Sequence, residues 1–517
     1  MTTRCKNGSR RARSGAVKTT MLVFVAAMLG GATAPRGTMT PEARTAAYLD
    51  SIADSPPQLR IFLQTMPKGG DLHNHAGGAI YAEDMLAWAA ADGLCLSTDT
   101  ARVAPPPCDA PGRVAAADLV RDYPRYAAFI DGFSTRGFEA GIGDPRVSGY
   151  DRFFSTFDAF WPIAARHGGK VIALARQQAA ADGVSYAELS GGSAATQPLL
   201  AKVGDGDVGD LAALYARVAP ELPGAVQATR TQYDAYEAEM ARIDGCGTPS
   251  PKPACATEIR YQYAAIRTRP PAQVFAELAL GFALVQADPR FVAVNIVAPE
   301  HNPVALRDYA LHMRMLRFLK ERYPTVPLSL HAGELTLGLV PPRELAFHIH
   351  DAVTVAGARR IGHGIDIPYE TDARALLARM ARDRVAVEIN LTSNAVILGV
   401  KGRDHPLSLY RQAGVPVVLS TDDEGVSRSD MTNEYLRGVT EQKLRYLDLK
   451  QMARDSVHYS FLPGESLWQD RAGGPRVPAC RVLDAEACRT FTANHVKARM
   501  EARLERDFDH FERQAIH

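Results

Sequence analysis

The sequence predicts a (β/α)8 barrel of the TIM type, with insertions and with extra helices at both ends. Short β-branched runs alternate with helical stretches over most of the 517 residues, which is typical of a parallel α/β architecture. The intervals from His331 to His363, on to Asn394 and on to Asp422 are each roughly 30 residues, the length of one βα unit. Side chains repeated at this interval are expected at the same end of successive strands, which is the catalytic rim of such a barrel.

Composition and charge narrow the class of protein. With 46% apolar residues, 23% charged residues and a net charge of +1, the chain is globular and long enough to bury a full barrel core. Beyond the N-terminal segment, no basic stretch is interleaved with aromatic residues. Nucleic acid is therefore not an expected partner.

Residues 1–34 have the three parts of a signal peptide. A basic cluster is followed by the apolar run Met21–Gly31 and then by the small residues Ala32 and Ala34. The apolar run is too short to cross a bilayer as a mature helix, so no stable membrane insertion is expected. The pattern predicts an exported protein, either periplasmic or secreted.

The cysteines agree with export. After Cys5, the other six cysteines fall into three close pairs, and none forms a CxxC motif. Three local disulfides formed in an oxidising compartment are the simplest interpretation, and six free thiols in a cytosolic enzyme are the alternative. The expected pairs are Cys95 with Cys108, Cys246 with Cys255, and Cys480 with Cys488.

A lead-in over 35–66, helical from Pro41 to Ile61, precedes one metal-dependent barrel domain over 67–517, which has insertions near 92–148 and 218–257. The first four strands are expected at Lys68–Ala76, Val184–Leu189, Ile259–Ile266 and Phe291–Val297. The other four strands are expected to end at His331, His363, Asn394 and Asp422. Apolar periodicity predicts helices over 150–175, 272–285 and 494–514.

Five aromatic residues share one face of the helix expected over 150–175. Core packing is the favoured interpretation of this face, and a lid over a substrate is the alternative. The five residues are Phe153, Phe154, Phe157, Phe160 and Trp161.

The side chains at the strand ends can form a metal site. His73 and His75 stand two residues apart on one strand, so both imidazoles face the same side. His331 and Asp422 come from the fifth and eighth strands, and the eighth strand adjoins the first in a closed barrel. Three imidazoles and one carboxylate suit one Zn2+ ion per chain and leave a position for an activated water.

Further polar groups at the same strand ends are free for proton transfer. Glu334 lies three residues after His331 and is not needed as a ligand, so it can handle protons. His363 can either orient the attacking water or take its proton. Asp423 is expected to meet the substrate or His363 rather than the metal.

Ser393 and Asn394 are expected to position the neighbouring ligands. Four other histidines lack a strand-end context and are expected in the core or at the surface. These are His301, His348, His350 and His405.

Seven segments of the chain match one family pattern. They read MPKGGDLHNH, FFSTFDAFWPIA, YAEL, SLHAGE, RIGHG, TSN and LSTDDEGV. Together they resemble the adenosine deaminase family of the amidohydrolase superfamily, and the resemblance covers most of residues 66–440. The signal segment, the MPKGG lead-in and the cysteine-bearing insertions look more like the secreted, growth-factor-related branch of that family than like its short cytosolic enzymes.

The resemblance implies a zinc-dependent hydrolase that converts adenosine and 2′-deoxyadenosine to inosine and ammonia, by hydroxide attack at purine C6. The implied zinc ligands are His73, His75, His331 and Asp422. Glu334 would protonate the ring nitrogen N1, His363 would hold and deprotonate the water, and Asp423 would contact N7.

The chain departs from the family pattern in three places. Gly77 stands where the HxHLDG pattern has an aspartate for the ribose. Ala298 replaces a glycine whose backbone meets the purine edge, and Asn390–Leu391 replace a Cys-Pro pair. The metal and proton machinery is thus kept, whereas the substrate contacts at Gly77 and Ala298 are altered.

These departures keep several hypotheses open. The chain is either an adenosine deaminase or a deaminase of another 6-aminopurine compound. A two-metal amidohydrolase is a third hypothesis, because Glu300 follows the fourth strand, although no lysine stands there. A non-catalytic binding protein on the same fold is the fourth. The expected partner is a small-molecule nucleoside, and a homodimer is compatible with the sequence.

Overall fold

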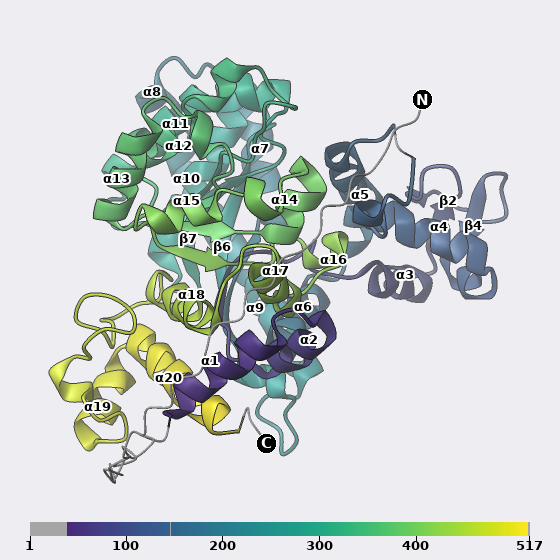
Figure 1. The fold of residues 1–517 in the computed structure, drawn as a ribbon. Coiled ribbons are helices and arrows are strands. Elements are labelled where there is room, and N and C mark those ends of the chain that lie inside the picture. The colour runs from purple at the N-terminus through teal and green to yellow at the C-terminus, as the bar shows by residue number, and fades with distance from the viewer. Residues whose placement is uncertain (1–38, 145, 515–517) are drawn as a thin grey trace, which may run out of the picture. The chain divides into compact units, whose positions relative to one another are not determined.

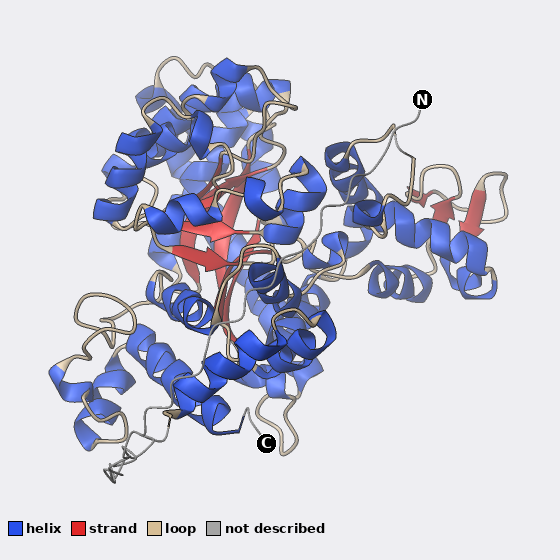
Figure 2. Cartoon of the chain, viewed as in Figure 1, coloured by secondary structure: helices blue, strands red, loops and turns tan. Residues whose placement is uncertain are grey.

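Eight parallel strands close into a barrel in the computed structural model, which describes residues 39–144 and 146–514 (Figure 1). Two four-stranded sheets, in the orders β1-β5-β6-β7 and β11-β10-β9-β8, are joined by parallel bridges between Val294 and Leu328 and between Asn74 and Asp422. Figure 2 shows these strands with helices around them. The predicted (β/α)8 fold is confirmed.

The four longer strands agree with their predicted ranges to within two residues. They are β1 (Gly69–His75), β5 (Val184–Gly191), β6 (Glu258–Ile266) and β7 (Phe291–Val297). All residues of β7 are buried, because helices cover the outer face of a parallel barrel and side chains fill its interior. This explains why β7 is apolar on both faces apart from Asn295.

The other four strands are shorter. They are β8 (Ser329–Ala332), β9 (Arg360–His363), β10 (Ala386–Ile389) and β11 (Val417–Leu419). The predicted strand end at Asn394 is wrong, since β10 stops at Ile389 and Asn394 lies in α14 (Leu391–Leu398). The chain turns helical at once, with the Asn394 amide donating to the Asn390 carbonyl. Asp422 likewise lies three residues beyond β11 rather than in it.

Two predicted helices are each split in the structure. The lead-in forms α1 (Pro41–Ile52) and α2 (Pro56–Thr65), which separate at Pro56–Pro57 because proline lacks the amide hydrogen that would continue a helix. The aromatic helix forms α5 (Gly149–Ala164) and α6 (Gly168–Ala181), with the break just before two consecutive glycines.

The remaining helices cover the barrel, fill the insertions and end the chain. Those up to the end of the barrel are α3 (Ala82–Ala91), α4 (Tyr123–Phe133), α7 (Gln197–Val203), α8 (Leu211–Val218), α9 (Leu222–Asp244), α10 (Pro271–Ala287), α11 (Pro303–Arg322), α12 (His348–Asp351), α13 (Ala373–Asp383), α15 (Leu407–Gln412) and α16 (Glu424–Ser427). The C-terminal ones are α17 (Met431–Thr440), α18 (Tyr446–His458), α19 (Glu486–Asn494) and α20 (Val496–Gln514).

The first insertion has its own apolar core. A small antiparallel sheet, β2 (Cys95–Ser97), β3 (Val103–Ala104) and β4 (Arg113–Ala115), packs with α3, α4 and α5 (Figure 1). Phe153 and Phe160 of α5 are buried in this core, which supports the packing interpretation for part of the aromatic face. The rest of that face has another use, described below.

The three predicted disulfides are present in the structure. They join Cys95 to Cys108, Cys246 to Cys255 and Cys480 to Cys488. The predicted signal peptide lies outside the described residues. Among the helices that the structure does describe, none is both long enough and apolar enough to cross a membrane.

Candidate metal centre and active site

A cavity of about 810 Å³ opens at the carboxyl ends of the barrel strands. Its floor is polar and includes His75, His331, Glu334 and His363. Its walls are largely apolar and include aromatic side chains of α5. A concave apolar pocket with a few convergent polar groups is the usual form of a small-molecule site.

Four predicted strand-end groups converge within this floor. Ligand atoms of His73, His331, His363 and Asp422 all lie within 4.8 Å of one another, an arrangement that could hold a metal ion. His75 adjoins them, since its Nε2 is 3.0 Å from Nε2 of His331 and 3.3 Å from Oδ1 of Asp422. The barrel closure between β1 and the segment after β11 brings Asp422 beside the two histidines of β1.

Hydrogen bonds behind two of the histidines fix which ring nitrogen is free. His73 Nδ1 lies 2.8 Å from the Glu388 carboxylate, an acceptor, so Nδ1 carries the proton and Nε2 faces the cluster with a lone pair. His331 Nδ1 lies 3.0 Å from Oδ1 of Asn295. The Asn295 side chain must present its oxygen here and not its nitrogen, because the same atom accepts a hydrogen bond from the backbone amide of Ile296. Both histidines therefore present bare Nε2 atoms to the cluster, as metal ligands must.

Glu388 and Asn295 are site residues that the sequence interpretation missed. Glu388 is the one charged residue of β10, and Asn295 is the one strongly polar residue of β7. A lone polar side chain in a fully buried strand is the signal that could have found them, because such a group needs a specific partner. Glu388 is held in turn by the buried guanidinium of Arg360, which also pairs with Glu188.

Glu334 lies on the turn after β8 and is buried in the pocket floor. Burial raises its pKa well above the ordinary value, and the nearby carboxylates of Asp422 and Glu300 raise that pKa further. Glu300 accepts hydrogen bonds from the backbone amides of Gly333 and Glu334 at 3.1 and 2.8 Å and lies 2.6 Å from Nδ1 of His348. Glu300 thereby fixes the turn that carries Glu334, and the raised pKa of Glu334 favours its protonated form.

His363 and Asp422 both adopt the left-handed backbone conformation. Their φ angles are 68° and 59°, which L-residues other than glycine seldom adopt. Such strained residues cluster at functional sites, where the surrounding structure holds them. Ser393 donates a 2.6 Å hydrogen bond to Oδ2 of Asp422, and Asn394 places its amide nitrogen 3.0 Å from Nδ1 of His363.

The two neighbouring aspartates have opposite electrostatic preferences. Burial acts to raise the pKa of Asp422, but His73, whose Nε2 lies 3.4 Å from Oδ1, and the charges of the other nearby histidines outweigh it and lower that pKa. Burial raises the pKa of Asp423 well above its ordinary value, and the Asp422 carboxylate adds to this. Asp423 also lines the cavity, with a buried Oδ1 that has no hydrogen-bond partner among the described residues.

Gly77 and Ala298 lie in the cavity wall, at the places where the family pattern is altered. A Cβ on Gly77 would be 2.8 Å from Cζ3 of Trp161, so the Trp161 ring takes the space that a side chain would need. Ala298 has a φ of 85°, a conformation suited to glycine, so the backbone bend persists although the residue is alanine. Phe154, Phe157 and Trp161 line the cavity, so the aromatic face serves the pocket as well as the core.

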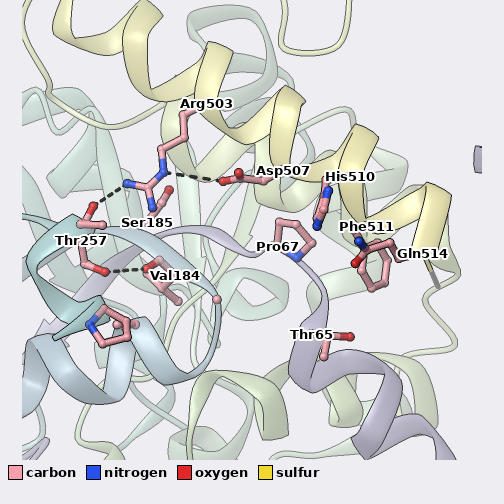
Figure 3. A pocket seen from close by; sticks show the side chains of 14 residues that line it. Thr65, Pro67, Val184, Ser185, Thr257, Arg503, Asp507, His510, Phe511 and Gln514 are labelled. Carbon is pink, nitrogen blue, oxygen red and sulfur yellow. Dashed lines mark hydrogen bonds and ion pairs between the residues drawn. The ribbon is translucent and has the colours of Figure 1, made fainter.

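A second cavity of about 640 Å³ lies at the amino ends of β5 and β6 (Figure 3). Figure 3 shows Arg503, Asp507 and His510 of α20 on one side and Ser185 and Thr257 on the other. Arg503 pairs with Asp507 and donates to the Ala256 carbonyl. None of the metal-competent cluster lines this cavity, so the site chemistry belongs to the first one.

Comparison with known proteins agrees with this geometry. The family model described as adenosine deaminase matches residues 242–468, a shorter stretch than the motifs suggested. An adenosine deaminase from Enterococcus faecalis is 34% identical over 139 residues, which are 27% of this chain and 38% of that protein. The chain thus spans well under half the length of this curated relative.

Two solved structures share the fold. The N6-methyl-AMP deaminase of Arabidopsis thaliana superposes with a TM-score of 0.50 and 18% identity, covering 78% of this chain and 94% of that one. An amidohydrolase from Burkholderia ambifaria, solved with bound zinc, gives a TM-score of 0.51 and 16% identity, covering 88% and 94%. Over residues 242–468, which carry His331, Glu334, His363 and Asp422, the chain is similar to the adenosine deaminase family.

Proposed function

We propose that the protein is a zinc-dependent deaminase that converts adenosine and 2′-deoxyadenosine to inosine and 2′-deoxyinosine with release of ammonia. The observation that carries this proposal is the pairing, in one cavity, of a metal-competent cluster with Glu334, a buried carboxyl group whose pKa is raised. Hydrolytic deamination needs an activated water on one side and a proton donor for the ring on the other. Perturbed carboxyl groups of this kind are typical of catalytic acids.

The donor set fits zinc. His73, His75, His331 and Asp422 offer three imidazole nitrogens and one carboxylate, the ligand types of catalytic zinc sites. Nε2 of His73 is buried without a hydrogen-bond partner among the described residues, and it faces the cluster. A bound zinc ion would supply a water that is nucleophilic at neutral pH.

The remaining polar groups would handle the substrate. As C6 gains an oxygen from water and loses its amino group as ammonia, N1 gains a proton, and Glu334 is placed to donate it. Asp423, whose pKa is raised, would be protonated, and its carboxyl group would donate a hydrogen bond to N7 of the purine. His363 would hold the attacking water.

The charges that line the cavity favour a nucleoside over a nucleotide. Arg269 is the only lysine or arginine among the described residues of the lining, and its Nε lies 3.2 Å from the Glu277 carboxylate. Glu334, Asp422 and Asp423 add acidic groups at the floor. A 5′-phosphate would therefore meet a neutralised cation and several carboxyl groups, whereas phosphate sites normally offer free arginine or lysine.

A different 6-aminopurine compound is the second candidate substrate. The ribose-binding aspartate of the family pattern is absent at Gly77, and Trp161 occupies that side of the cavity. A two-metal reaction is less favoured, because both Glu300 oxygens are engaged by Gly333, Glu334 and His348.

Conversion of adenosine to inosine by the purified protein tests the proposal, with a chelator-treated sample beside it. We expect chelator-sensitive ammonia release with adenosine and 2′-deoxyadenosine, and much weaker release with adenine and AMP. Turnover of AMP in preference to adenosine would reject the nucleoside assignment. No turnover of any of the four by zinc-loaded protein would reject deamination of these purines.

We also propose that the protein is exported and belongs to the secreted, growth-factor-related branch. Three disulfides support an oxidising compartment, since such bonds are rare in the cytosol. Protein purified from its native compartment is expected to lack residues 1–34. We expect an alkylating reagent to label six thiols in this protein after reduction and none without reduction. Six thiols that react without reduction would contradict export.

A further inference from the structure

His405 is a buried histidine that the sequence analysis assigned no role. It is 2% exposed and lies just before α15, outside the cavity lining. Its Nε2 is 3.1 Å from Oδ1 of Asn394, whose amide nitrogen is 3.0 Å from Nδ1 of His363. A continuous hydrogen-bonded chain thus runs from His405 through Asn394 to the histidine at the metal-competent cluster.

The direction of this chain is set by a backbone amide. The Leu407 N–H donates to Nδ1 of His405 at 3.1 Å, so this nitrogen carries no proton in that bond. The proton of the neutral His405 ring is then on Nε2, and it can be donated only to an oxygen. Oδ1 of Asn394 therefore faces His405, which leaves the NH2 group of Asn394 to face His363.

An amide NH2 group can only donate, so Nδ1 of His363 is an acceptor. The Asn390 amide nitrogen lies 3.4 Å from the same Nδ1, on the residue that replaces the family cysteine. The proton of the neutral His363 ring is thus on Nε2, which points toward Oδ2 of Asp422 at 3.9 Å. His73 and His331 have the opposite arrangement, with their protons on Nδ1.

We infer that His405, acting through Asn394, holds His363 in the Nε2–H tautomer, so that His363 donates a hydrogen bond to the attacking water oxygen and does not coordinate the metal. This inference rests on the proposed function for the identity of that oxygen. It decides between the two roles open for His363, because a ring nitrogen that already carries a proton orients a water and cannot remove its proton. His405 is a positioning residue, since it touches neither the cavity nor the cluster.

The tautomer can be measured without any assay of activity. In the zinc-loaded full-length protein labelled with 15N in the histidine rings, nitrogen chemical shifts distinguish a protonated ring nitrogen from a bare one. The His363 signals are assigned by their loss in His363→Asn. We expect a protonated Nε2 and a bare Nδ1 for His363, and the reverse proton position for His73 and His331. A protonated Nδ1 on His363 would overturn the inference, whether or not the protein deaminates adenosine.

Variants of His405 separate positioning from simple packing. His405→Gln keeps an amide that can donate to Oδ1 of Asn394, whereas His405→Glu offers an acceptor that turns the Asn394 amide around. We expect His405→Glu to move the His363 proton to Nδ1 and to lower kcat by roughly 10- to 100-fold with little change in KM. We expect His405→Gln to retain the tautomer and most of kcat.

Equal losses in both His405 variants, with an unchanged tautomer, would show that His405 only packs. If neither variant folds, the proton position in the wild-type protein still decides the matter. If the wild-type protein shows the expected tautomer but turns over no aminopurine, the proposed function fails and the relay stands.

Discussion

The two halves of the barrel are built differently. The half formed by β1, β5, β6 and β7 has strands of 7 to 9 residues and carries the insertions, whereas β8 to β11 have 3 or 4 residues each. The short-strand half supplies Glu334, His363 and Asp422, and the family match covers all of it. The long-strand half supplies the aromatic wall and the altered positions Gly77 and Ala298. On the proposed function, proton transfer belongs to the short-strand half and the altered substrate contacts belong to the long-strand half, with the metal ligands drawn from both.

The largest expected effect is the loss of the proposed proton donor in the short-strand half. Glu334→Gln should lower kcat by roughly 10²- to 10⁴-fold, because an amide cannot transfer a proton to N1. Zinc content should not change, as Glu334 is not needed as a ligand. Steady-state kinetics with metal analysis of the same sample measure both quantities. Glu321→Gln, at an exposed position, is a matched control and should keep full activity. Retained activity in Glu334→Gln would show that Glu334 is not the proton donor.

The support behind a metal ligand should have the next largest effect. Glu388→Gln removes the carboxylate that accepts from Nδ1 of His73, and zinc affinity should fall roughly 10- to 100-fold. Competition against a chelator of known affinity measures the change. Glu188→Gln is the control, since Glu188 pairs with the same Arg360 but does not touch His73. Both variants should lose stability. A similar loss of zinc affinity in both would show that the loss comes from general destabilisation and not from the missing contact with His73.

The sequence predicted the strands and most of the site residues well, but it did not predict the residues that hydrogen-bond to those site residues from behind. Strand β7 was predicted to the residue, because Phe291–Val297 is apolar apart from Asn295 and is bounded by turn signals. His331, His363 and Asp422 were found because their spacing follows the repeat of the barrel, and His73 was found because it forms an HxH pair with His75 on one strand. Glu388 and His405 were missed because their importance lies in which groups they meet, and those partners are distant in the sequence. The helix at Asn394 was missed because a polar segment after a strand can either continue as extended backbone or turn into a helix.

The helix α11, which joins the two halves, should make stability depend on pH. His312 in this helix is buried with no hydrogen-bond partner for either ring nitrogen among the described residues, and burial lowers its pKa from 6.5 to about 4. The unfolded chain therefore binds a proton that the folded protein excludes between about pH 6.5 and 4, so stability is lost as pH falls through this window.

Between pH 7 and 5 this single histidine should cost about 2 kcal/mol of unfolding free energy. His312→Leu should abolish that part of the loss, and urea unfolding at the two pH values measures it. His350→Gln, at an exposed position in the next connection, between β8 and β9, serves as the control. Identical pH dependence in His312→Leu and the wild type would show that His312 does not contribute.

The smallest expected effect tests the wall of the long-strand half. The ring of Trp161 abuts Gly77 and lines the cavity. Trp161→Ala should raise KM about tenfold and leave kcat nearly unchanged, because the contact is made equally in the ground state and the transition state. Trp161→Phe retains a ring against Gly77 and should recover much of the affinity. An equal fall in kcat and kcat/KM for Trp161→Ala would place this residue with the proton chemistry, and the division of labour between the two halves would fail at that position.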